Sequence, residues 1–274
     1  MTRVVVTGAS GFVGRHLCSR LATGGARVIA GVRQSQVIGG AEANALMTPE
    51  SSLEHLTEAL QGAQAVVHLA AAVHDVQGRT TQADYSRVNR DYPLLLARAA
   101  VAAHVERFVF VSTIKVNGEG TSGNAAYRED SPASPHGPYA ESKWQAEQSL
   151  LQLSANTGLQ MRIVRPPLVY GPGVRANFHS LMRWVQRGVP LPFGSLHNAR
   201  SLVYVENLTD LLARLALGTG NEANSQTYLV SDGADLSTPE LVRGIATALG
   251  VSPRLVPVPE FLLRNVLSAL GRGK

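Results

Sequence analysis

The sequence predicts an α/β protein with a parallel sheet covered by helices on both faces, followed by a smaller C-terminal α/β unit. Short apolar runs alternate with longer amphipathic segments through the first 170 residues, which is the order that a doubly wound parallel sheet requires. Beyond residue 170, proline, glycine, asparagine and arginine become frequent and the apolar runs become isolated. We therefore expect a main domain over residues 1–170. We expect residues 171–274 to form the second unit, mainly for ligand binding, with some strands and helices returning to the main sheet.

The individual elements follow from hydrophobic periodicity. A strand is expected where apolar, often β-branched residues follow one another, and a helix where apolar residues recur every three or four positions. Residues 34–48 are poorly patterned, so no element is predicted there. The pattern predicts strands at 3–7, 26–32, 63–71, 107–112 and 161–166, and helices at 11–23, 51–60, 84–104, 139–156 and 260–270.

Composition narrows the class of protein. Apolar residues make up 45% of the chain and charged residues 16%, which suits a folded core and not a disordered chain. The sequence has neither an apolar run long enough to span a membrane nor the long apolar stretch of a secretory signal. The single cysteine, Cys18, excludes an internal disulfide and favours a reducing compartment, so we expect a cytoplasmic protein.

The chain is basic, but its charges are scattered. Its 25 basic and 20 acidic residues give a formal net charge of +5, which suits an anionic ligand, whereas nucleic-acid binding would need clustered charges. Only Lys115, Lys143 and Lys274 are lysines. Because a lysine can change its pKa whereas an arginine stays charged, the two internal lysines are candidate functional residues.

A glycine-rich turn joins the first predicted strand to the first predicted helix. Gly8, Gly11 and Gly14 have the spacing G-x-x-G-x-x-G, which permits a tight turn and a close approach of the backbone to a pyrophosphate. Exposed N–H groups and the helix dipole then favour negative charge. The turn predicts a Rossmann-type dinucleotide site with contacts from Gly8, Ser10, Gly11, Phe12, Val13 and Gly14.

The end of the second predicted strand bears on the choice of dinucleotide. A carboxylate at this place bonds the adenosine ribose and selects NAD. Here the strand ends with Gly31-Val32-Arg33, without a carboxylate. Because an arginine can bind a 2′-phosphate, we expect NADP rather than NAD, with Arg33 as the phosphate ligand and NAD as the alternative.

Five segments together resemble the extended branch of the short-chain dehydrogenase/reductase superfamily, the NAD(P)-dependent nucleotide-sugar epimerases and dehydratases of the UDP-glucose 4-epimerase type. These segments are TGASGFVG at 7–14, VSTIKVNG at 111–118, YAESK at 139–143, RPPLVYGPG at 165–173 and RSLVYVENL at 200–208. The resemblance covers nearly the whole chain. It implies further cofactor contacts from Leu69, Ala70, Ala71, Asn89, Val111, Ser112, Tyr139, Lys143, Pro166, Leu168 and Val169.

The same resemblance implies catalytic roles for Tyr139, Lys143 and Thr113. Tyr139 and Lys143 are four residues apart on a predicted helix, so both side chains can reach one site. Free tyrosine has a pKa of about 10, and about 4 kcal/mol of differential stabilisation would make it a proton acceptor near neutral pH. A lysine ammonium and a positive nicotinamide ring would supply favourable charge. Thr113 would hydrogen-bond the reacting sugar oxygen, and Ser112 would lie beside the nicotinamide.

The resemblance also implies a substrate site and narrows the reaction. Family members that remove water from the sugar carry an Asp-Glu pair where this chain has Ile114 and Lys115, so dehydration is disfavoured and hydride transfer at C4 remains. Lys115 is either a substrate contact or a solvated side chain. The implied substrate residues are Thr113, Lys115, Asn117 and Asn177, with Leu191 and Phe193 against the nucleotide base and Arg200 on the diphosphate.

Two reactions share these residues. An epimerase oxidises C4, turns the keto-sugar and returns the hydride to the other face, whereas a 4-keto-reductase delivers hydride once. We expect a UDP-sugar 4-epimerase of surface-polysaccharide metabolism, with an NADPH-dependent UDP-4-keto-sugar reductase as the alternative. A non-catalytic dinucleotide sensor is a third hypothesis, which the intact catalytic residues disfavour. Relatives pair the helices at 84–104 and 139–156 across a twofold axis, so a homodimer is expected, without metal or nucleic acid.

Overall fold

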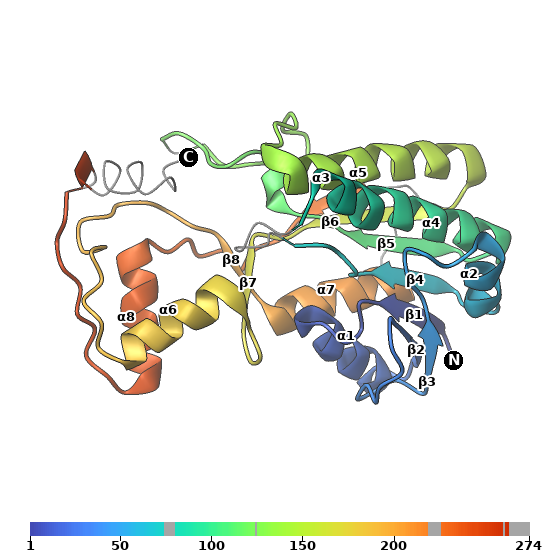
Figure 1. The fold of residues 1–274 in the computed structure, drawn as a ribbon, viewed down its shortest axis with the longest axis horizontal. Coiled ribbons are helices and arrows are strands. Elements are labelled where there is room, and N and C mark those ends of the chain that lie inside the picture. The colour runs from blue at the N-terminus through green and yellow to red at the C-terminus, as the bar shows by residue number, and fades with distance from the viewer. Residues whose placement is uncertain (74–79, 124, 219–225, 260, 263–274) are drawn as a thin grey trace. The chain divides into compact units, whose positions relative to one another are not determined.

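The computed structural model describes residues 1–73, 80–123, 125–218, 226–259 and 261–262 (Figure 1). The chain divides into two compact units, each assembled from separate stretches of sequence. One unit comprises Met1–Pro167 and Val205–Val230, and the other comprises Leu168–Tyr204 and Ser231–Lys274. The first stretch of the main unit therefore ends at Pro167, and a later segment returns to the sheet.

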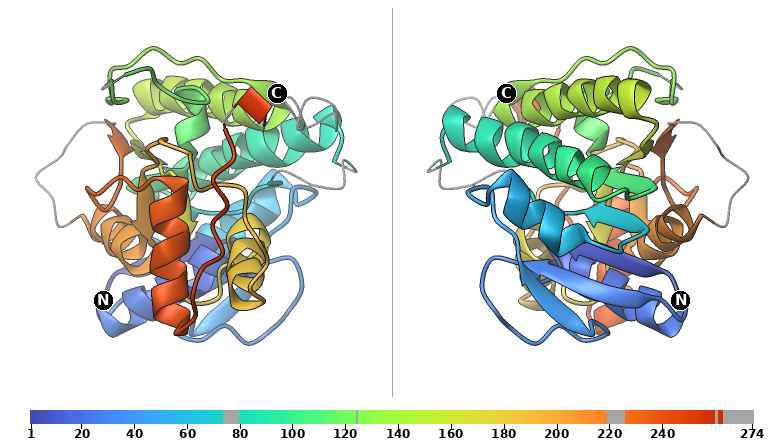
Figure 2. Two further views of the ribbon diagram at one scale, coloured as in Figure 1. Left: turned by 90° about the vertical axis from the view of Figure 1, so that its left-hand side faces the viewer. Right: turned by 90° about the vertical axis from the view of Figure 1, so that its right-hand side faces the viewer.

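The first unit is built on a seven-stranded sheet in the order β3-β2-β1-β4-β5-β6-β9, in which all paired strands are parallel (Figure 1). The turned views show β1, β2 and β3 side by side (Figure 2). The strands leave β1 in opposite directions, so the switch point lies at the carboxyl ends of β1 and β4. The predicted doubly wound sheet is confirmed. Its strands are β1 Arg3–Thr7, β2 Arg27–Val32, β3 Ala43–Leu46, β4 Ala65–His68, β5 Arg107–Val111, β6 Gln160–Arg165 and β9 Gln226–Leu229.

β3 lies within the stretch 34–48, where the sequence predicts no element. It is an edge strand of four residues, and three of them are exposed. Without a buried face, such a strand has no apolar alternation by which the sequence could reveal it.

Helices cover both faces of this sheet (Figure 1). α1 (Phe12–Thr23) packs against α7 (Val205–Leu217) on one face. On the other face, α2 (Leu53–Leu60), α4 (Tyr92–Ala102) and α5 (Gly137–Thr157) enclose one apolar cluster with the strands. The small residues of α4 allow the close packing. The fully buried members of the cluster include Leu56, Leu60, Val66, Leu96, Ala97, Ala99, Ala100, Phe108, Phe110 and Leu150.

The helix predicted over 84–104 has three parts. α3 (Gln82–Tyr85) is followed by a π-helical turn, η1 (Ser86–Asp91), and then by α4. Pro93 stands at the start of α4 and has no N–H to donate to the carbonyl of Asn89, four residues earlier. The wider π-turn at this point removes the need for that bond.

The second unit holds a separate two-stranded parallel sheet of β7 (Leu168–Tyr170) and β8 (Leu202–Tyr204). α6 (Ala176–Gln186) and α8 (Thr238–Leu249) enclose its apolar cluster. Most of the helix predicted at 260–270 lies outside the described residues. Across the part of the chain that the structure describes, no helix is long and apolar enough to cross a membrane.

Candidate active site

The glycine turn after β1 forms a cradle that no larger residue fits. Gly8 has a φ of +70°, and a Cβ there would lie 2.7 Å from the backbone nitrogen of Ala70. A Cβ on Gly14 would lie 2.3 Å from the carbonyl oxygen of Gly8. The Gly11 N–H closes the turn by donating to that same carbonyl at 2.9 Å. The backbone at this turn is therefore open to a ligand on one side and closely packed on the other.

The N-terminus of α1 opens onto this cradle. Gly11 is the N-cap residue, and none of the side chains in the described ranges caps the helix or places a carboxylate in its first turn. The first N–H groups of a helix lack partners within the helix, and together with the helix dipole they favour an anion. This end of α1 therefore suits a pyrophosphate.

A cavity of about 310 Å³ lies at the carboxyl ends of β1, β2 and β4. It brings together seven of the predicted cofactor residues, namely Gly8, Ser10, Gly11, Arg33, Leu69, Ala70 and Ala71. Sequence reasoning missed the other walls of its far end, which are Met47, Pro49, Glu50, Arg87, Val88 and Tyr92. Met47, Pro49 and Glu50 come from the loop after β3, Arg87 and Val88 from the π-turn, and Tyr92 from the start of α4.

Ser112 extends the fit to a dinucleotide beyond the cavity. It follows β5 directly and is 4% exposed, and its Oγ has no hydrogen-bond partner among the residues described. A buried hydroxyl without a partner is costly unless a ligand satisfies it. The glycine cradle, the open helix end and this hydroxyl together fit a dinucleotide.

Lys143 of α5 is buried against the end of β5. Its Nζ donates a hydrogen bond of 2.7 Å to the carbonyl oxygen of Val111 and lies 4.3 Å from the centre of the Phe110 ring. Burial lowers the pKa of Lys143 to about 7, and the Glu147 carboxylate one turn along the helix opposes this shift. The lysine therefore titrates near neutral pH.

Tyr139 lies one turn before Lys143, with its ring edge-on to Tyr85 at 6.3 Å between centroids. Burial raises the pKa of Tyr139 to about 12, a hydrogen bond with the Thr113 side chain lowers it, and Tyr85 raises it further. Burial thus outweighs the groups of this chain that favour the phenolate. With the groups of this chain alone, Tyr139 is a neutral phenol at pH 7. The acidic phenol that the sequence predicts also needs the charge of a nicotinamide ring, and it stays a prediction.

Thr113 caps the short 3₁₀ turn η2 (Ile114–Val116), where its Oγ1 accepts a hydrogen bond of 3.3 Å from the Lys115 N–H. Thr113 forms a hydrogen bond with Tyr139, and Lys143 donates a hydrogen bond to the Val111 carbonyl. These contacts bring the three predicted catalytic residues together at the end of β5. The Lys115 side chain lies at the surface and pairs with Glu119 at 3.1 Å.

A buried ion pair braces this cluster. Arg165 of β6 donates to both carboxylate oxygens of Glu147, at 3.0 and 2.5 Å, and to the amide oxygen of Asn117 at 3.1 Å. Glu147 is fully buried, and the other two are nearly so. The group ties α5 to β6 and to the turn after Thr113. Asn117 therefore has a structural partner, and its contact with substrate stays a prediction.

Sequence reasoning passed over Glu147 although a signal was present. It is four residues after Lys143 and thus on the same helical face, and a carboxylate on a buried face requires a partner. Arg165 stands in a buried strand, where a guanidinium has the same requirement. The sequence offers no means of telling that these two meet.

Asn89 lies on the π-turn and is fully buried. Its Oδ1 accepts from the N–H of Ala72 at 2.8 Å, and its Nδ2 donates to the Ala72 carbonyl at 2.9 Å and to the Ser142 hydroxyl at 3.1 Å. Asn89 thus holds the loop after β4 against α5. A direct contact with the cofactor stays a prediction.

The remaining predicted residues are distributed over both units. Pro166 directly follows β6, and its carbonyl accepts from the Ile114 N–H at 3.0 Å. Leu191 lies in the core of the second unit, with Phe193 packed beside it. The other second-unit candidates are Leu168 and Val169 on β7, exposed Asn177 on α6, and exposed Arg200, whose backbone pairs with Leu236. Their contacts with cofactor or substrate stay predictions.

The fold and the cluster of Tyr139, Thr113 and Lys143 suit hydride transfer to or from a nicotinamide dinucleotide. Together they define an enzyme of the extended short-chain dehydrogenase/reductase type. Residues 4–230 match the model of the NAD dependent epimerase/dehydratase family, and the chain belongs to this family. The predicted family is confirmed.

Relatives and solved structures agree with this placement. The chain is 37% identical over 268 residues to the UDP-glucose 4-epimerase of Vibrio cholerae, and the match covers 93% of this chain and 78% of the relative. MoeE5, solved with UDP-glucuronic acid and NAD, is 28% identical with a TM-score of 0.79 and coverage of 93% and 85%. The UDP-glucose 4-epimerase of Thermus thermophilus, solved with NAD, is 26% identical with a TM-score of 0.76 and coverage of 94% and 86%.

Proposed function

We propose that this enzyme interconverts UDP-sugars at C4 of the sugar, as a UDP-sugar 4-epimerase in surface-polysaccharide metabolism. The observation that carries the proposal is the cluster of Tyr139, Thr113 and Lys143 at the carboxyl end of β5, two strands from the glycine cradle. The similarity to the Vibrio cholerae UDP-glucose 4-epimerase supports the choice of substrate.

The proposed chemistry divides the work among these residues. A bound NAD supplies the hydride acceptor and a positive charge. The Thr113 hydroxyl bonds the oxygen on C4 and orients it toward Tyr139. Tyr139 takes the proton of that hydroxyl during oxidation and returns a proton during reduction, so one phenol serves as base and then as acid. Lys143 in its ammonium form favours the phenolate electrostatically.

The proposed cofactor contact at the adenosine end is Arg33. Its side chain is exposed and lines the cavity, and in the described part of the chain it has no ion-pair partner. A free guanidinium there suits a 2′-phosphate and so favours NADP over NAD. This preference is the one observation that favours the alternative 4-keto-reductase. Exchangeable NADPH on the purified protein would favour that alternative, and tightly retained NAD the epimerase. We also propose a homodimer through α4 and α5.

Substitution of Tyr139 tests the function. For Tyr139→Phe we expect conversion of UDP-galactose to UDP-glucose to fall by roughly 10²- to 10⁴-fold, the usual contribution of a positioned acid–base group. Dinucleotide affinity stays unchanged because the glycine cradle is intact. The matched control is Tyr127→Phe, which removes a phenolic hydroxyl bonded to the Gly120 carbonyl and keeps full turnover. Full turnover in Tyr139→Phe contradicts the proposal.

A further inference from the structure

Two arginines line the cavity, and among the residues described only one of them is paired with a carboxylate. Arg33 follows β2 and is unpaired within the described ranges, whereas Arg87 comes from the π-turn η1 and is paired. Both line the same cavity of about 310 Å³ as the glycine turn. A phosphate on the adenosine ribose could therefore meet one guanidinium or two, depending on the state of Arg87.

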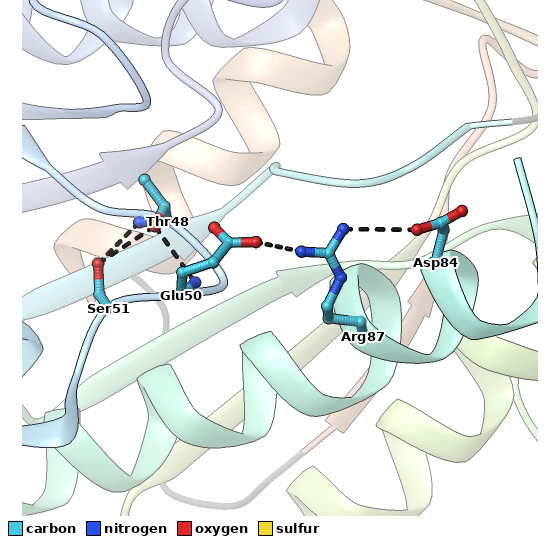
Figure 3. A network of polar contacts seen from close by, with 5 residues as sticks. All are labelled: Thr48, Glu50, Ser51, Asp84 and Arg87. Carbon is cyan, nitrogen blue, oxygen red and sulfur yellow. Dashed lines mark hydrogen bonds and ion pairs between the residues drawn. The ribbon is translucent and has the colours of Figure 1, made fainter.

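Two carboxylates hold Arg87, one from each side (Figure 3). Its Nη1 donates to Glu50, and its Nη2 lies 3.4 Å from the Asp84 carboxylate. Of the two carboxylates, only Glu50 lines the cavity. The charge of Arg87 is thus compensated from both ends, and the Glu50 side of the pair faces the cofactor site.

The loop after β3 presents Glu50 in a defined position. The Ser51 hydroxyl accepts from the Thr48 N–H at 3.1 Å, and the Thr48 hydroxyl accepts from the Glu50 N–H at 3.2 Å (Figure 3). Side-chain bonds of this kind fix a tight turn. Glu50 therefore reaches Arg87 from an ordered turn.

We infer that the Glu50–Arg87 pair is a second determinant of cofactor selectivity, which opposes Arg33 by withholding Arg87 from the ribose 2′-position and favouring NAD. The inference rests on the proposed dinucleotide function. Nothing in the family assignment identifies either residue.

The sign of the effect follows from charge. A 2′-phosphate carries a charge of about −1.5 to −2, whereas the NAD ribose presents neutral hydroxyls. Glu50 repels the phosphate and occupies Arg87, and neither effect weakens the binding of a neutral ribose. Selectivity of this kind depends on a repulsive group as much as on an attractive one. Removing the Glu50 carboxylate frees the side of Arg87 that faces the cavity, while Asp84 still pairs with Arg87 on the other side. The phosphate can then meet Arg33 and Arg87, and guanidiniums suit a phosphate because they donate paired hydrogen bonds.

The experiment measures binding of NADPH and NADH by nucleotide fluorescence on the full chain after removal of co-purified nucleotide. For Glu50→Gln we expect the NADPH Kd to fall roughly three- to fivefold, the upper part of the range for an exposed charge pair, and the NADH Kd to stay within about twofold. Adding Arg87→Gln to Glu50→Gln abolishes the gain. Arg87→Gln alone leaves the Glu50 carboxylate without its cation in the cavity, so we expect the NADPH Kd to rise while the NADH Kd stays within about twofold.

Glu42→Gln is the matched control. It removes one carboxylate from an exposed glutamate–arginine pair, Glu42 with Arg27 at 2.9 Å, which does not line the cavity. The inference predicts no change of selectivity there.

Four results overturn the inference. One is an unchanged NADPH to NADH ratio in Glu50→Gln, or an equal change in Glu42→Gln. Another is weaker NADH binding in Glu50→Gln with unchanged NADPH binding, which would make Glu50 a direct ribose ligand. The last is binding of neither nucleotide. The binding experiment contains no sugar, so it is independent of the proposed reaction. If Glu50→Gln shows the expected shift in nucleotide affinity but the wild type does not turn over UDP-sugars, the proposed reaction is refuted and the selectivity inference is supported.

Discussion

Lys143→Met should abolish turnover and yet stabilise the fold. Burial lowers the pKa of this lysine from 10.5 to about 7. The folded state therefore opposes the ammonium by about 5 kcal/mol when the lysine is charged. Methionine has a similar length and no charge. Its substitution loses the hydrogen bond to Val111 and leaves that carbonyl without a donor, which costs about 1–3 kcal/mol.

The net expectation is a gain of about 2–4 kcal/mol at pH 6, where most of Lys143 is charged. For a domain of this size that corresponds to a rise in Tm of roughly 5–10 °C. The gain depends on pH with a defined sign. Between pH 7 and 10.5 the unfolded wild type holds the proton of Lys143 and the folded one does not, so the wild type gains stability with rising pH and the advantage of the variant shrinks.

Urea unfolding measures the difference in unfolding free energy between Lys143→Met and the wild type at several pH values between 6 and 9.5. The contributions of titrating groups that both proteins share cancel in this difference. A Lys143→Met protein that is less stable than the wild type at pH 6 would refute the reasoning. So would a stability difference that stays constant over the whole range. Either result would mean that the folded state does not disfavour the ammonium.

Two further predictions concern the brace and the cradle. Glu147→Gln should destabilise the fold by about 3–5 kcal/mol, because it leaves the buried Arg165 guanidinium unpaired, while the exposed control Glu42→Gln changes the unfolding free energy by less than about 1 kcal/mol. A loss below 1 kcal/mol in Glu147→Gln contradicts the brace. Gly8→Ala should weaken NADH binding at least tenfold because its Cβ would meet the backbone of Ala70, whereas Gly25→Ala, with a similar φ of +79° and open space around its Cβ, binds normally. Equal losses in both variants would attribute the effect to backbone strain alone.

The sequence predicts those parts of the molecule that depend on local pattern. Alternating apolar runs indicate the parallel sheet, and glycines between a strand and a helix indicate the cradle. The spacing of Tyr139 and Lys143 places them on one helical face, and the structure brings Thr113 to them. Each of these signals lies within a few neighbouring residues, where periodicity and turn chemistry operate.

The parts that the sequence does not predict depend on long-range approach. Glu50 meets Arg87 across 37 residues, from the loop after an edge strand that has no buried face. Glu147 meets Arg165 between a helix and a strand. The high pKa of Tyr139 is also tertiary, because burial by the surrounding elements sets it. No local pattern reports which distant side chains will pair or how deeply a phenol will be buried.

Isotope transfer tests the central claim most directly. UDP-galactose carrying deuterium on C4 is incubated with the enzyme in ordinary water, and the product is analysed by mass spectrometry. The account predicts UDP-glucose that retains the deuterium on C4, since the hydride leaves and returns to the same carbon, and no conversion with Tyr139→Phe. Product that has lost the label, or conversion that survives Tyr139→Phe, would contradict it.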